Sequence, residues 1–244
     1  MNYLSGFLMV KDEDPFLHEW IAFHRTQGYT KFYIYDNGSK IPVKKILMKE
    51  IKEGLVDVTV WKDKKTGRHV RAMNHCLNRN DIKTTWLSLT DIDEFIYGEK
   101  EPVIKFLKKN EKYNSLKFTW LGFSASGHQD TPKGLVMESY TKRGDFGDLP
   151  GGKSIVKFGK IRSMKDPHNP RGNNIGPQFR EHIFINHYVT RSLNDWKEKC
   201  RKGGGNGRPR KMETFKYIQK KLSKHKCERI LKYLEGTKKF LDLR

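Results

Sequence analysis

The chain has 244 residues, and their composition is that of a folded protein with a basic surface. Hydrophobic residues make up 36% and aromatic residues 12%, which excludes an intrinsically disordered chain. No apolar run approaches the roughly 18 residues that span a bilayer, and the N-terminus lacks a signal-peptide pattern. The three cysteines have no Cys-x-x-Cys spacing, which argues against a disulfide framework or a structural zinc site. We expect a soluble, cytoplasmic protein, or one whose membrane anchor is absent or removed.

The formal net charge of +21 is concentrated toward the C-terminus. Residues 191–244 hold 18 Lys and Arg against 6 Asp and Glu. Such a segment can bind nucleic acid, a phosphorylated ligand or, weakly, an anionic membrane surface, and it can equally be a solvated basic face.

The first ninety residues alternate between predicted strands and helices. Strands are predicted at residues 3–10, 31–36, 55–61 and 84–90, and helices at residues 15–27, 43–53 and 68–80. Gly28 and Gly54 follow the first two helices, where glycine commonly ends a helix. This alternation predicts an α/β domain with a mainly parallel central sheet.

The second half is richer in strands and loops. Extended segments are predicted at residues 115–123, 134–140, 153–158 and 179–189, and loops at residues 144–152 and 166–177. A capped helix over residues 192–202 precedes a glycine-rich hinge or loop at residues 203–207, and one or two basic helices follow over residues 212–234. We expect a principal domain over residues 1–205 and a basic helical extension over residues 206–244 packed on it.

Two aspartates, Asp91 and Asp93, follow directly on the apolar strand at residues 84–90. As the chain leaves the strand, both carboxylates can turn toward the same end of the sheet. Carboxylates are hard oxygen ligands for Mg²⁺ or Mn²⁺, which often complete their shells with phosphate oxygens and water. The alternative is an acid that caps a helix or a turn. Placement after a strand favours a metal site.

Acidic residues also follow two other predicted strands, at residues 12–14 and at Asp36. Ligands of parallel sheets bind beyond the carboxyl ends of the strands. We therefore expect these acids and residues 91–94 to converge at one edge.

Several motifs occur in a fixed order along the chain. They are KDEDPFLHEWIAFH at residues 11–24, YDNGS at residues 35–39, TDIDEF at residues 90–95, WLGF at residues 120–123 and HYVTRS at residues 187–192. This series, which covers roughly residues 3–203, resembles glycosyltransferase family 92 and related family-2-like enzymes of the GT-A fold. The resemblance implies a Rossmann-like fold that binds nucleotide sugars, with residues 1–205 as the catalytic domain. It also implies a metal-dependent, inverting transfer of a sugar from a nucleotide diphosphate sugar, usually a UDP-sugar, to a hydroxyl of a glycan or glycoprotein.

The same resemblance implies roles for individual residues. The nucleotide would be held by Lys11, Asp12, Glu13, Asp36 and Asn37. Asp91 and Asp93 would bind the diphosphate and Mn²⁺ or Mg²⁺, and His187 would be a further metal ligand. Arg191 and Lys199 would neutralise the leaving diphosphate. The alternatives are a half-buried strand histidine for His187 and ordinary surface charge for Arg191 and Lys199.

Other residues are weaker candidates. Arg71 and Asn74 lie one helical turn apart and can face the nucleotide together. Trp120 and Phe123 can form an aromatic floor for a sugar, or belong to the core. An inverting transfer needs a carboxylate base, for which Asp130 ranks ahead of three further acids in the second half. Those three are Asp145, Asp148 and Glu181. His168 lies in a proline-rich stretch that favours a surface turn.

Two other classes of protein remain open. A basic nucleic-acid-binding module would explain the charge, although no zinc-finger or RNP motif supports it. A nuclease or phosphotransfer enzyme would use the same acids, but it usually gathers more of them around two metal ions.

Overall fold

The structure is a computed structural model that describes residues 1–203 and 209–242. The first ninety residues alternate between strands and helices, as the sequence predicts. In chain order these elements are β1 (Asn2–Val10), α1 (Asp14–Thr26), β2 (Lys31–Asp36), α2 (Val43–Ile46), α3 (Met48–Lys52), β3 (Val56–Val60), α4 (Arg68–Leu77) and β4 (Thr84–Leu89). The helix predicted over residues 43–53 is divided in two at Leu47, whose side chain is fully buried.

The next stretch is mostly extended and ends in a helix. Its elements are β5 (Glu94–Gly98), α5 (Val103–Lys109), β6 (Ser115–Phe123), α6 (Val136–Ser139), β7 (Lys142–Arg143), β8 (Gly152–Lys157), β9 (Ser163–Asp166), β10 (Asn169–Arg171), β11 (Ile175–Phe179), β12 (Ile183–Tyr188) and α7 (Leu193–Lys202). The predicted cap of α7 is confirmed, because the Ser192 hydroxyl accepts from the Asp195 amide and the Asp195 carboxylate accepts from the Ser192 amide.

The extended segment predicted over residues 134–140 is wrong, because α6 forms there. The carboxylate of Glu19, on α1, accepts from the amides of Val136 at 2.7 Å and Met137 at 3.0 Å. These amides belong to the first turn of a helix, where backbone N–H groups have no partner within the helix. The side chain that caps α6 therefore lies more than a hundred residues earlier in the chain.

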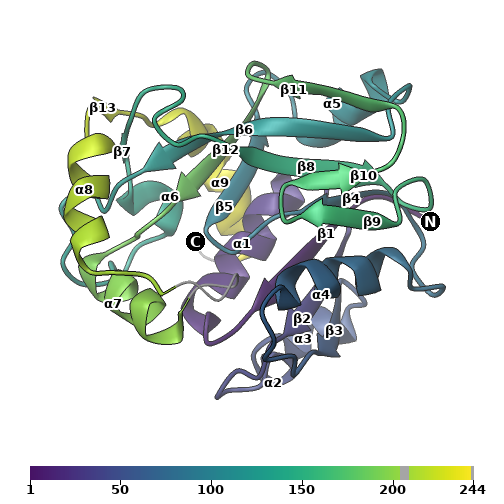
Figure 1. Ribbon diagram of the computed structural model, residues 1–244, viewed down its shortest axis with the longest axis horizontal. Coiled ribbons are helices and arrows are strands. Elements are labelled where there is room, and N and C mark those ends of the chain that lie inside the picture. The colour runs from purple at the N-terminus through teal and green to yellow at the C-terminus, as the bar shows by residue number, and fades with distance from the viewer. Residues whose placement is uncertain (204–208, 243–244) are drawn as a thin grey trace.

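A twisted sheet runs through the molecule (Figure 1), in the strand order β13-β7-β6-β8-β4-β1-β2-β3, where β13 is the short C-terminal strand His225–Lys226. The pairs β1–β2, β1–β4 and β2–β3 are parallel, as predicted. Beyond β4 the sheet is mixed, because β8 runs antiparallel to both β4 and β6. Strand β12 then pairs parallel with β6 and antiparallel with β5.

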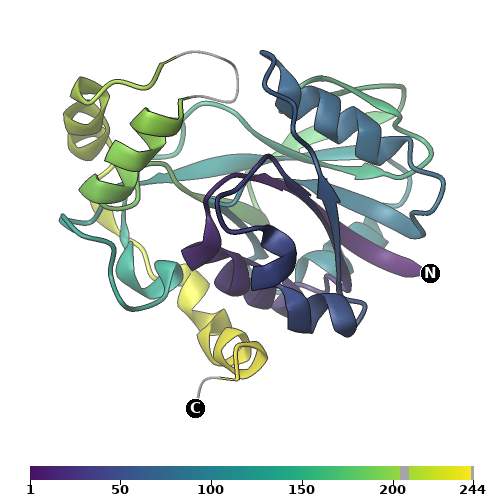
Figure 2. The ribbon, with the colours of Figure 1, turned by 90° about the horizontal axis from the view of Figure 1, so that it is seen from below.

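Apolar side chains cover both faces of the parallel strands. Phe7, Tyr33 and Tyr35 pack with residues of α4, whereas Leu8 and Ile34 pack in the larger cluster with α1. Figure 2 shows α1 and α4 on opposite sides of the sheet. Burial on both faces explains why these strands read as continuous apolar runs in the sequence.

The carboxyl ends of β1 and β2 lie side by side, with Val10 paired to Asp36. Strand β4 runs parallel to β1 on its other side, so the segment after Leu89 leaves the sheet at the same edge. A cleft lies at this edge, and of the strand-end acids only Glu13, Asp91 and Asp93 line it among the described residues.

The C-terminal segment contributes α8 (Glu213–Lys221), β13 (His225–Lys226), the 3₁₀ helix η1 (Arg229–Tyr233) and α9 (Leu234–Phe240). Strand β13 pairs with β7, and the Arg25 guanidinium on α1 lies 3.9 Å from the ring centre of Phe240 on α9. The predicted domain boundary at residues 205 and 206, and most of the glycine-rich segment, lie outside the described residues. None of the helices in the described ranges is long and apolar enough to cross a membrane.

Candidate active site

A cleft of about 530 Å³ lies at the carboxyl ends of β1, β2 and β4. Its walls come from these strand ends, from the start of α4, from β6 and β12, and from α7. The predicted site residues that line it are Lys11, Glu13, Asn37, Asp91, Asp93, Trp120, His187, Arg191 and Lys199. Residues far apart in the sequence thus meet where ligands of α/β sheets bind.

Asp91 and Asp93 lie on the tight connection between β4 and β5. The Glu94 amide donates to the Asp91 carbonyl, and the Asp91 amide donates to the Glu94 carboxylate at 2.8 Å. Ile92 packs into the core between the two aspartates. The Asp93 carbonyl accepts from the Tyr188 amide, which ties the connection to the end of β12. Both carboxylates consequently face the cleft from a hydrogen-bonded backbone.

Each aspartate is paired with a buried lysine. The Lys153 Nζ lies 2.8 Å from the Asp91 Oδ2, and the Lys199 Nζ lies 2.6 Å from the Asp93 Oδ2. Burial alone would raise the pKa of Asp91, but the Lys153 ammonium brings it to about 2. Burial acts on Asp93 in the same way, and the Lys199 ammonium holds its pKa well below the usual value. Both carboxylates are therefore ionised at neutral pH.

The second oxygen of each aspartate faces a histidine. The His69 Nε2 lies 3.3 Å from the Asp91 Oδ1, and the His187 Nε2 lies 3.7 Å from the Asp93 Oδ1. Burial lowers the pKa of His69 to about 4, so its imidazole is neutral at pH 7. A neutral imidazole has a lone pair that can serve a metal ion or accept a hydrogen bond.

These side chains are of the types that hold Mn²⁺ or Mg²⁺: carboxylate oxygens and imidazole nitrogen. Among the described residues, the His187 Nδ1 and the Glu94 Oε1 are buried without hydrogen-bond partners, and the two atoms lie 3.9 Å apart. Within the described ranges, no three His, Cys, Asp or Glu side chains are close enough together to form a metal site. The chemistry of the donors fits a divalent cation, while Lys199 holds one Asp93 oxygen.

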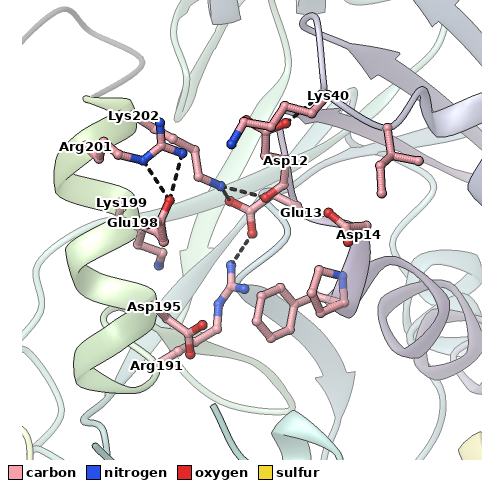
Figure 3. A pocket seen from close by; sticks show the side chains of 13 residues that line it. Asp12, Glu13, Asp14, Lys40, Arg191, Asp195, Glu198, Lys199, Arg201 and Lys202 are labelled. Carbon is pink, nitrogen blue, oxygen red and sulfur yellow. Dashed lines mark hydrogen bonds and ion pairs between the residues drawn. The ribbon is translucent and has the colours of Figure 1, made fainter. Parts of the chain in front are cut away.

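A second ionic cluster joins α7 to the loop after β1 (Figure 3). The Glu13 carboxylate lies 2.8 Å from the Arg191 Nη2 and 2.8 Å from the Lys202 Nζ. Lys202 also donates to the backbone carbonyls of Lys11 and Asp12. Glu13, predicted to bind the nucleotide, is thus engaged by two cations in this structure.

Arg191 lies between the cleft and the smaller pocket drawn in Figure 3. Its side chain is 2% exposed, its guanidinium lies 3.6 Å from the Phe16 ring centre, and its Nε has no hydrogen-bond partner in the part of the chain that the structure describes. The backbone φ of +54° is uncommon for a residue other than glycine, and such strain is concentrated at functional sites. A buried guanidinium with an unused donor fits an anionic ligand.

The structure separates the two predicted aromatic residues. Trp120 lines the cleft, with its ring 4.7 Å from that of His187 and 5.1 Å from that of His168. His168 therefore lines the cleft as well, although its sequence favoured a surface turn. Phe123 is fully buried against Tyr188 and belongs to the core.

Several predicted nucleotide-binding residues are not among those that line the cleft. The Asp36 carboxylate accepts from the amides of Ser39 and Val43, so it stabilises the turn after β2. The Asp12 carboxylate accepts from the Lys40 amide. Among the α4 residues, Arg71 is paired with Asp63, and the Asn74 side chain accepts from the Met164 amide.

Asp130, the predicted base, lies on an exposed turn and accepts from the Asn194 side chain at 2.5 Å. It is not among the residues that line the cleft. Its role as the base is untested, and its position outside the cleft lining counts against that role.

Sequence reasoning missed Lys153, His69 and Lys202. Lys153 is 1% exposed, and lysine is almost never fully buried unless it is paired. No local pattern distinguishes it from the other lysines of the chain, because its partner Asp91 lies far away in the sequence, on the connection between β4 and β5. His69 lies in the first turn of α4, beside the edge of the sheet that carries the cleft. That position at the start of a helix was the only feature of the sequence that could have indicated a site residue.

The model of the family described as Glycosyltransferase family 92 matches residues 9–232, which is most of the chain. The chain belongs to glycosyltransferase family 92. Family membership and the parallel β3-β2-β1-β4 core agree with the expected GT-A fold.

Curated family 92 proteins from plants are similar to this chain. One from Oryza sativa subsp. japonica is 27% identical over 141 residues, covering 55% of this chain and 24% of that protein. One from Ricinus communis is 25% identical over 205 residues, covering 78% of this chain and 36% of that protein. The chain thus spans only about a quarter to a third of the length of these relatives.

Solved structures show weaker similarity. S. aureus TarS in complex with UDP-GlcNAc has a TM-score of 0.49 at 12% identity, covering 98% of this chain and 73% of that one. GalNAc-T7 with UDP, GalNAc and Mn²⁺ has a TM-score of 0.47 at 11% identity, covering 96% of this chain and 57% of that one.

Proposed function

We propose that the protein transfers a sugar from a nucleotide diphosphate sugar, with a UDP-sugar as donor, to a hydroxyl of a glycan or glycoprotein. Family 92 membership supports the reaction class. The cleft at the strand ends supports roles for particular residues, because two ionised aspartates lie there within reach of several cationic side chains. A diphosphate needs such cations as negative charge develops on the leaving group.

The cations that would neutralise the leaving diphosphate are Arg191, Lys199 and Lys202. All three line the cleft, and each is largely buried. In a site with little water, their charges act on the phosphates more strongly than surface charges would. The imidazole of His69, in the first turn of α4, is neutral, so it adds a hydrogen-bonding group to the cleft without adding charge.

Asp91 and Asp93 would hold Mn²⁺ or Mg²⁺, with His187 as a third ligand. When bound, such a cation acts as a Lewis acid on the diphosphate. The His187 Nε2 lies 3.7 Å from the Asp93 Oδ1, although no three such side chains of the described residues are close enough together here to form a metal site. The Glu94 Oε1, 3.9 Å from the His187 Nδ1, is placed to accept from that nitrogen if Nε2 binds the ion.

The sugar would lie against Trp120, whose ring borders the cleft beside His187. For an inverting transfer, the acceptor hydroxyl must lose its proton to a base. Among the described residues, the carboxylates that line the cleft are Glu13, Asp91 and Asp93, and each is paired with a cation.

A weak association with an anionic membrane surface is proposed for α8. This helix exposes Lys216 and Lys220, and its Tyr217 is 62% exposed. Basic residues next to exposed aromatic residues are typical of helices that lie on anionic lipid surfaces.

A melting experiment tests the proposed function. UDP with Mn²⁺ should raise the melting temperature, because a ligand that binds only the folded state stabilises it. A screen of UDP-sugars for Mn²⁺-dependent hydrolysis then identifies the donor. Stabilisation by short DNA or RNA without a metal requirement, and none by UDP, would favour a nucleic-acid-binding protein instead.

A further inference from the structure

The two lysines that pair with the aspartates differ in position. Lys153 is 1% exposed, is not among the residues that line the cleft, and lies 3.9 Å from Glu94 as well as 2.8 Å from Asp91. It is a fixed counter-ion behind the site. Lys199 lines the cleft itself, where a ligand can reach it.

The Lys199 ammonium is held by two oxygens, the Asp93 Oδ2 at 2.6 Å and the Val189 carbonyl at 2.7 Å. The ammonium is therefore bound to the Asp93 Oδ2, which is one of the two carboxylate oxygens that a cation on Asp93 would use. The other Asp93 oxygen faces His187. A divalent cation that uses both Asp93 oxygens would lie within a few ångströms of this ammonium, and the repulsion between the two positive charges favours displacement of the lysine.

Displacement requires another partner for the ammonium, because a buried lysine is rarely stable without one. The cleft around Lys199 offers mostly positive charge: Arg191, Lys202 and Arg210 also line it. A divalent cation entering alone would add to this charge while releasing Lys199 from Asp93. A diphosphate entering with the cation supplies the missing anion.

We propose that Lys199 makes cation binding conditional on the donor, by exchanging the Asp93 carboxylate for a diphosphate oxygen when cation and diphosphate enter together. This inference rests on the proposed function, since it takes Asp93 as a cation ligand. It assigns to Lys199 a coupling role beyond neutralising the leaving group. Cation alone then binds weakly, and cation with diphosphate binds tightly.

The test measures Mn²⁺ binding by electron paramagnetic resonance, which reports free Mn²⁺, with and without UDP. In the wild-type protein, UDP should tighten Mn²⁺ binding by at least about tenfold, within the usual range of coupling between two ligands. In Lys199→Met, Mn²⁺ alone should bind about tenfold more tightly than in the wild type, and the effect of UDP should shrink to about threefold or less. Lys199→Gln, which retains a hydrogen-bond donor, serves as a second variant if Lys199→Met does not fold.

Lys202→Met is the matched control. It removes the same charge from the same cleft, but its partner is Glu13 and not Asp93. If only the loss of positive charge matters, Mn²⁺ should bind more tightly to both variants by a similar factor. The exchange instead predicts that Mn²⁺ affinity rises more in Lys199→Met, and that only this variant loses the effect of UDP on Mn²⁺ binding. Equal effects in the two variants, or unchanged Mn²⁺ affinity in Lys199→Met, would overturn the exchange.

The outcomes also separate this inference from the proposed function. UDP-sugar turnover that requires Mn²⁺, together with unchanged coupling in Lys199→Met, overturns the exchange and leaves the proposed function standing. Absence of Mn²⁺ binding in every protein, with or without UDP, overturns the exchange and the metal assignment. UDP binding in the presence of EDTA then shows whether the donor site survives.

Discussion

The ammonium of Lys153 and the carboxylate of Asp91 form a buried ion pair of 2.8 Å, in which the lysine is 1% exposed and the aspartate about a third exposed. A lysine held this deeply fixes one Asp91 oxygen and leaves the other toward His69 and the cleft. The carboxylate is thereby oriented before any ligand arrives, which reduces the reorganisation that binding requires.

Lys153→Met should destabilise the fold by about 2 kcal/mol. Removing one partner of a buried pair costs about 3–5 kcal/mol, and the partial exposure of Asp91 reduces that figure. Urea unfolding measures the change. The double variant Asp91→Asn with Lys153→Met should recover at least half of the loss, because the Asp91 charge that Lys153→Met leaves unpaired is removed. Strictly additive losses would show that the pair is not coupled.

The stability contribution of His24 should depend on pH. Its Nδ1 donates to the Trp20 carbonyl and its Nε2 accepts from the Ile96 amide, an arrangement that only the neutral ring can make. Burial lowers the pKa of His24 to about 3, below the value of about 6.5 expected in the unfolded chain. The contribution is therefore complete above pH 6.5 and is lost as the pH falls toward 3.

Comparison with His24→Gln isolates this effect from other titrating groups. The stability difference between wild type and variant should be about 2 kcal/mol smaller at pH 5.0 than at pH 7.5. Urea unfolding at the two pH values measures it. A difference that does not change with pH would mean that His24 is not held neutral in the fold.

Trp120 and Phe123 should separate function from stability. Trp120→Ala should lower kcat/KM for the donor by at least about tenfold, because the ring that borders the proposed sugar site is lost. Phe123→Ala should cost about 3–5 kcal/mol of stability, because it empties a fully buried site. At a temperature where both variants are folded, a larger loss of kcat/KM in Phe123→Ala would refute this division.

Asp130→Asn should change turnover by less than about threefold, because the Asp130 carboxylate is exposed and lies outside the cleft lining. A catalytic base must come within hydrogen-bond reach of the proton it removes. Steady-state kinetics with the identified donor and acceptor measure the effect. A loss of a hundredfold or more with unchanged UDP affinity would instead identify Asp130 as the base.

The sequence predicted the parallel half of the fold well, since its signals are local. The apolar runs of β1 and β2, and the Asp91 and Asp93 carboxylates after β4, follow from patterns of a few residues. The segment at residues 134–140 was misjudged because a distant carboxylate, that of Glu19, caps α6. Such long-range hydrogen bonds leave no trace in the local pattern.

The candidate site, like the fold, could be predicted from the sequence only where the signals are local. Residues placed directly at strand ends, such as Asp93 and Asn37, could be predicted from chain order alone. The direction of a side chain could not be predicted. Asp36 is the last residue of β2, but its carboxylate accepts from the amides of Ser39 and Val43 in the segment that follows. Lys153 and His69 were missed because burial and charge pairing arise only when separate elements pack together.

Calorimetric titration of UDP with and without Mn²⁺, in the wild type and in Asp93→Asn, decides whether Asp93 takes part in cation-dependent binding of the donor. The wild-type protein should bind UDP in a Mn²⁺-dependent manner, and Asp93→Asn, still folded by circular dichroism, should lose the Mn²⁺-dependent part of the affinity. Equal, Mn²⁺-dependent binding of UDP to both proteins would contradict it.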